Sequence, residues 1–135
     1  MRRIFCTLIV IASFCAAAPS SGADVRITGT FSNLRYNSEG GDLLGLEILI
    51  VPGKGDRGGY VAFVQLAEGG APYSALVPLR VDGAKVEFTL PKSGSMPEIR
   101  FSGVVSKTQL IGAWSHGGER EVLKRGVSYW DATAL

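Results

Sequence analysis

Short apolar runs separated by turns rich in glycine and proline make up the chain after residue 23. Several of these runs, such as 84–90 and 98–105, alternate apolar and polar residues. Such alternation is typical of a β-strand with one buried face, so the pattern predicts an all-β domain. The predicted strands span residues 25–31, 44–51, 60–67, 74–81, 84–90, 98–105, 109–115 and 120–126.

The connections between these strands are short and have recognisable turn residues. Asp82-Gly83 between two apolar runs is a strong signal for a two-residue hairpin, and Ser106-Lys107 forms another tight turn. A single antiparallel up-and-down β-barrel of about eight strands is the fold expected from such consecutive hairpins. A two-sheet β-sandwich is the alternative.

The run 44–51 is apolar on both faces except at Glu47, so we expect this strand to be covered on its outer side as well. A buried carboxylate needs a partner, because an unpaired charge is costly in an apolar environment. An ion pair with Arg35, Arg80 or Arg100 is the favoured interpretation. A contact between Glu47 and a ligand is the alternative.

The first 23 residues have the pattern of a secretory signal peptide. Arg2 and Arg3 precede an uncharged apolar run, and small residues follow at 21–23. The run is short of the roughly 20 apolar residues that a membrane-spanning helix needs. We therefore predict a signal peptide over 1–23, a single barrel domain over 24–135, and a periplasmic or secreted protein.

Composition narrows the chemistry of the exported domain. Both cysteines, Cys6 and Cys15, lie in the signal peptide, and the loss of two arginines balances the remaining charges. Without a long basic run, nucleic-acid binding is not expected. His116 is the single histidine, so neither a metal site nor a nucleophile–base pair is predicted, and we expect a non-enzymatic protein without a cofactor. No apolar segment after residue 23 is long enough to span a membrane.

One hairpin resembles a known family. The patterns Phe-x-Gly-x-Val over 101–105 and Leu-x-Gly-x-Trp over 110–114 are followed by Leu-Lys-Arg at 123–125. They resemble the late strands of small secreted calycin-type barrels, the lipocalin-like and avidin-like folds. Gly29-Thr30-Phe31 stands where lipocalins carry Gly-x-Trp, with Phe31 in place of tryptophan. The resemblance implies a cavity at one mouth of the barrel.

These observations favour binding as the function. The first hypothesis is a small apolar ligand in a barrel cavity lined by Phe88, Phe101 and Trp114, with Glu47 as a further candidate contact. The alternative is a protein-interaction module or inhibitor that uses the 52–59 loop and the aromatic tail with Tyr129 and Trp130.

Overall fold

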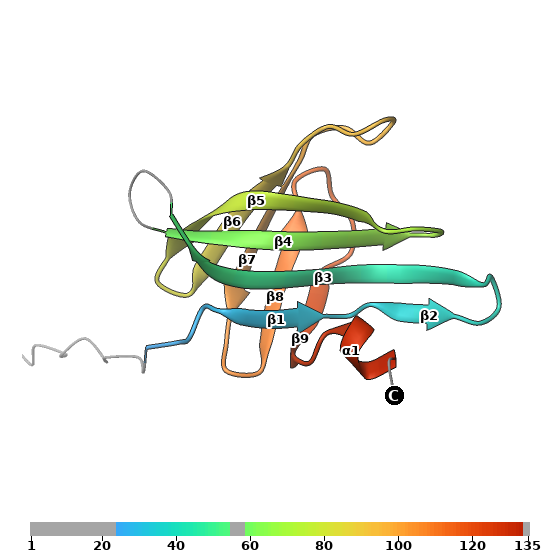
Figure 1. The fold of residues 1–135 in the computed structure, drawn as a ribbon. Helices are drawn as coiled ribbons and strands as arrows, with labels where there is room; N and C mark the ends of the chain where they lie inside the picture. Colours follow the sequence, from blue (N-terminus) through green and yellow to red (C-terminus); the bar gives the residue numbers. More distant parts are fainter. Residues whose placement is uncertain (1–23, 55–58, 134–135) are drawn as a thin grey trace, which may run out of the picture.

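The computed structural model describes residues 24–54 and 59–133, which form one nine-stranded sheet and a short C-terminal helix (Figure 1). The elements in chain order are β1 (Gly29–Ser32), β2 (Arg35–Asn37), β3 (Asp42–Gly53), β4 (Gly59–Glu68), β5 (Tyr73–Asp82), β6 (Lys85–Leu90), β7 (Ile99–Val105), β8 (Gln109–Trp114), β9 (Glu121–Gly126) and α1 (Tyr129–Thr133). The predicted signal peptide at 1–23 and part of the 52–59 loop lie outside the described residues.

All neighbouring strands are antiparallel, in the order β1-β9-β8-β7-β6-β5-β4-β3-β2. The sheet closes because β1 pairs with β3 on one side and β9 on the other. Eight strands thus form a closed barrel, and β2 is one extra strand beside β3. The predicted all-β barrel is confirmed, and the sandwich alternative is not the fold.

The first strand is shorter than predicted and the tail holds an unpredicted helix. β1 begins only at Gly29, because the carbonyls of Arg26 and Thr28 bind the Arg125 side chain instead of a neighbouring strand. The five-residue helix α1 is too short to show a helical period in the sequence. Within the described part of the chain, no helix has the length and apolar character needed to cross a membrane.

The interior of the barrel is filled with side chains. Alternate residues of every barrel strand point inward, as the period-two pattern predicts. The largest fully buried ones are Phe31, Phe101, Leu46, Ile48, Ile50, Leu90, Leu110 and Leu123 together with the smaller Val64 and Val105. An eight-stranded barrel is just wide enough for its inward side chains to fill it, and here they do.

Arg125 on β9 closes the end of the barrel where the chain enters β1. Its Nη1 donates to the Thr28 carbonyl at 2.8 Å, and its Nη2 donates to the carbonyls of Arg26 at 2.5 Å and Ser106 at 3.0 Å. The guanidinium carbon lies 4.4 Å from the centre of the Phe31 ring, a cation–π contact. Burial, and secondarily the charge of Arg26, lowers the pKa of Arg125 from its ordinary value. One side chain therefore joins the entry segment, the β7–β8 turn and the core.

We expect Arg125→Met to lower the free energy of unfolding by about 2–3 kcal/mol, because three carbonyls lose a charged donor while the apolar stem is kept. Lys124→Met is the matched control, since Lys124 is exposed on the same strand and should change stability by less than about 0.5 kcal/mol. Urea unfolding followed by circular dichroism measures both. Equal stabilities of the two variants would contradict this role for Arg125.

Candidate binding site

A pocket of about 670 Å³ lies at the opposite end of the barrel from Arg125. It opens where β4 ends, β7 and β9 begin, and β8 ends. Its apolar floor is formed by Leu66, Ile99 and Trp114. Its rim carries the polar and charged side chains Arg35, Glu68, His116, Glu119, Arg120 and Glu121. We call this site the mouth pocket.

The rest of this barrel end is covered by the 91–98 loop. Met96 from that loop packs against the core, and the Tyr73 hydroxyl donates to the Pro91 carbonyl at 3.3 Å. The loop therefore covers the β5–β6 side, and the mouth pocket occupies the side near β3, β4 and β9.

The three aromatic residues predicted to line a cavity lie together. The Phe88 and Phe101 rings stack at 5.1 Å, and the Trp114 ring meets Phe101 edge-on at 5.0 Å. Phe88 and Phe101 are buried and belong to the packed core, whereas Trp114 is half-buried and lines the mouth pocket. Trp114 is thus the member of the trio that a ligand at the mouth would meet.

One wall of the mouth pocket is held by Asn33. Its Nδ2 donates to Glu121 Oε2 at 2.8 Å, and its Oδ1 accepts from the Leu46 amide at 2.7 Å. Gly45 has a φ of +112°, and a Cβ there would come within 2.6 Å of the Asn33 carbonyl oxygen, so glycine is required for this approach. The sequence did not reveal Asn33 or Glu121, because residues 88 positions apart meet only when the barrel closes.

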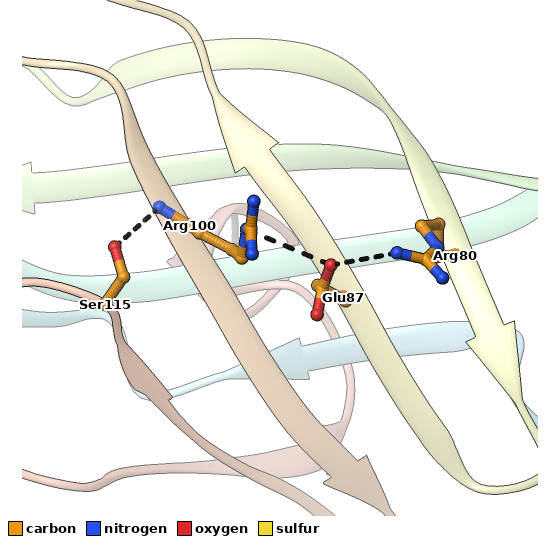
Figure 2. Close-up of polar contacts among 4 residues, drawn as sticks. All are labelled: Arg80, Glu87, Arg100 and Ser115. Carbon is orange, nitrogen blue, oxygen red and sulfur yellow. Dashed lines mark hydrogen bonds and ion pairs between the residues drawn. The ribbon is translucent and has the colours of Figure 1, made fainter.

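His116 lies on the rim of the mouth pocket, and its neighbour Ser115 is occupied elsewhere. The Ser115 hydroxyl accepts from the Arg100 amide at 3.2 Å, as Figure 2 shows. Among the described residues, no group of three or more His, Cys, Asp or Glu side chains is placed to hold a metal ion. The mouth pocket therefore combines the Trp114 indole in its floor with hydrogen-bonding and charged side chains on its rim.

Glu47 lies on the outer wall, beneath the C-terminal tail. Its neighbours Leu46 and Ile48 point into the core, so Glu47 points outward, yet it is buried. Its Oε1 accepts from the Ser128 hydroxyl at 2.6 Å and its Oε2 from the Tyr129 amide at 2.8 Å. The outer side of β3 is covered at Glu47, where the tail supplies the donors. The expected cover does not extend along the whole strand, because Leu49 and Val51 on the same face are exposed.

The predicted ion pair of Glu47 is replaced by another arrangement. Two of its three proposed partners, Arg80 and Arg100, flank Glu87 on the outside of β6 (Figure 2). The third, Arg35, lies on the rim of the mouth pocket. The Ser128 hydroxyl and the Tyr129 amide bind Glu47 in place of an arginine side chain. Sequence spacing does not reveal this contact, because the segment lies 81 residues away.

The aromatic tail is bound to the same wall. Trp130 Nε1 donates to Gln65 Oε1 at 2.7 Å, and the Tyr129 and Trp130 rings meet edge-on at 5.3 Å. Trp130 remains 44% exposed. Tyr129 and Trp130 thus lie on the outer wall over β3 and β4, away from the packed interior and from Trp114.

Comparisons of this chain with protein families, curated proteins and solved structures found no match.

We expect Ser128→Ala to lower the free energy of unfolding by about 1–2 kcal/mol, because it removes a donor to buried Glu47 and the helix-capping acceptor of the Trp130 amide. Ser102→Ala, on the exposed face of β7, is the control and should be near neutral. Thermal unfolding measures both changes. An unchanged midpoint for Ser128→Ala would show that the tail does not stabilise the barrel.

Proposed function

We propose that this chain is an exported, non-enzymatic binding protein that takes a small ligand in the mouth pocket. The observation that carries the proposal is a hollow of about 670 Å³ whose floor includes the half-buried Trp114. Concave sites with an apolar lining and a few polar groups are the usual places for small ligands, and barrel mouths are a common location.

The packed interior supports a ligand that binds at the mouth of the barrel. Phe88 and Phe101 pack directly against Trp114, and Phe31 fills the interior nearer Arg125, so the proposed ligand lies at the mouth and not deep within the barrel. An apolar part would rest on Trp114, Leu66 and Ile99. A polar part would meet the charged rim. The proposed ligand is therefore partly apolar, with hydrogen-bonding groups at one end.

Two features of the sequence support export of the protein and a binding site at the barrel mouth. The pattern of residues 1–23 supports export to the periplasm or the medium. The resemblance of 101–114 to calycin-type barrels supports a binding site at one mouth, and a closed eight-stranded barrel agrees with it. We propose on the same grounds that the chain is a lipocalin-like barrel.

Native mass spectrometry of protein purified gently from its own host is the first test. The expected result is a non-covalent adduct that is lost on denaturation, and its mass defines the compound to be used as the probe in solution. A bare chain under conditions that preserve weak complexes would contradict the proposal.

Two single-tryptophan variants then locate the bound compound. In Trp130→Phe, the remaining Trp114 should change its emission on addition of the compound identified by mass, because the indole forms the pocket floor. In Trp114→Phe, the remaining Trp130 lies on the outer wall and should not respond. A response from Trp130 alone would place the compound outside the barrel and overturn the mouth site.

A second candidate function is protein contact through an apolar outer face, which consists of Leu49, Val51, Val61, Phe63, Leu76 and Pro78 on β3, β4 and β5. These residues oppose one another in two adjacent rows and include no charged side chain. Monomers rarely expose a contiguous apolar patch beyond a few hundred Å². Trp130 lies beside this face because it is hydrogen-bonded to Gln65. Gln65 is the next residue after Phe63 on the outer side of β4.

We propose a second copy of this chain as the occupant of the apolar face. A charged partner would leave its charges unpaired there, whereas a second copy presents the same uncharged surface. Two such sheet faces pack against each other at a modest angle with interdigitated side chains.

We expect concentration-dependent dimers in sedimentation velocity, and their loss in Leu76→Lys. Leu76 is 68% exposed, so the substitution costs little stability in the monomer. Val127→Lys is the matched control, since Val127 is 70% exposed and lies outside the face. A chain that stays monomeric at its solubility limit, or a dimer that survives Leu76→Lys, would overturn this candidate.

A further inference from the structure

A second hollow, of about 720 Å³, lies on the outside of the barrel over β5 to β8. Its floor is made by the outward side chains of Ser102 and Val104 on β7 and of Ile111 and Ala113 on β8. Three of these four are apolar, and Val104 is half exposed. We call this site the outer groove, and the barrel wall separates its floor from the core.

A pair of glycines lies in the wall behind the outer groove. Gly103 and Gly112 are directly opposite each other on β7 and β8. A Cβ at Gly112 would collide with the Phe101 ring, and one at Gly103 would come within 2.8 Å of Leu110. The two glycines thus let core side chains lie flat against the inner face of the wall. The outer groove lies over this pair of glycines, whose lack of a Cβ permits the close approach of the core side chains.

A cluster of charged side chains from β5, β6 and β7 beside the outer groove carries an excess of positive charge. Glu87 Oε1 lies 3.4 Å from Arg80 Nη1 and 3.9 Å from Arg100 Nε, so two guanidinium groups share one carboxylate oxygen (Figure 2). The neighbouring Asp82 and Lys85 oppose each other across the β5–β6 turn and offset each other's charge. Arg100 lies on β7 and does not itself line the groove, but it is close to Glu87, so one positive charge remains near the apolar floor.

The loop on the other side of the outer groove adds to this excess. Arg120 lines the groove and has no ion pair within the part of the chain that the structure describes. A carboxylate, sulfonate or phosphate near these guanidinium groups would gain charge-assisted hydrogen bonds that water-exposed arginines can supply without rearranging the fold.

We propose that the outer groove binds a small amphiphilic anion, with an apolar body on Val104, Ile111 and Ala113 and an anionic end near Arg80. Glu87 acts as a resident competitor, because its carboxylate occupies the guanidinium groups that the ligand would use. The outer groove and the mouth pocket share only Gly118 and Arg120 among their described lining residues. The contacts proposed for the anion at Arg80, Val104, Ile111 and Ala113 do not involve the mouth pocket, so each proposal stands without the other.

Decanoate is the probe, and two substitutions with opposite charge effects test the assignment. Arg80→Gln should weaken decanoate binding about three- to fivefold, the range expected for one exposed charge contact. Glu87→Gln should strengthen it by a similar factor, because it frees both guanidinium groups. Lys124→Gln, an exposed charge removed elsewhere, should leave the dissociation constant unchanged.

Amide chemical shifts measured by NMR during the titration give both the affinity and the location. The expected result is perturbation of Ser102, Val104, Ile111 and Ala113, weaker binding at high salt, and little binding of uncharged decanol. Val104→Glu should reduce decanoate affinity more than tenfold, since it places a like charge in the floor. Shifts confined to Trp114 and His116, equal binding of decanol, or identical affinities for Arg80→Gln and Glu87→Gln would each overturn the proposal.

Discussion

Closure of the barrel through β1 is the constraint on which the other features depend. β1 has only four residues, yet it pairs with β3 along its whole length and with β9 over three positions. Closure removes the two edges that an open sheet would expose. Arg125 secures this closure, because it sits on β9, contacts the Phe31 ring on β1 and binds the carbonyls of the segment that leads into β1.

Because the closed barrel is filled, every binding site proposed for this chain lies on its surface. Inward side chains from all eight strands occupy the interior, and the stacked Phe88 and Phe101 rings support Trp114 from below. The surfaces proposed to bind other molecules are the mouth pocket, the outer groove and the apolar outer face. These three surfaces differ in chemistry: an indole floor with a charged rim, an apolar floor beside excess positive charge, and an uncharged apolar sheet.

The same residues that pack the core also shape these surfaces. Gly45 admits Asn33, which in turn holds Glu121 at the wall of the mouth pocket. Gly103 and Gly112 admit the Phe101 ring and lie directly behind the outer groove. Glycine at these positions is therefore a requirement of packing and, through packing, of the shape presented to a ligand.

Local sequence pattern was sufficient for the eight barrel strands and for the all-β barrel, but it did not reveal the three-residue β2. Alternation fixes which side chains of a strand share a face, and hairpin turns such as Asp82-Gly83 bring consecutive strands together, so both are encoded within a few residues. The grouping of Phe88, Phe101 and Trp114 followed from that alternation, because all three point inward on neighbouring strands.

Closure of the barrel determined the contacts between residues far apart in the sequence. The hydroxyl that binds Glu47 comes from 81 residues away, and two of the three carbonyls that bind Arg125 come from nearly 100 residues away. No local pattern specifies such contacts, because they depend on the register and curvature of the complete barrel. For the same reason, the sequence placed the aromatic trio around a cavity, whereas the closed structure has two of the rings within a filled core and one at its mouth.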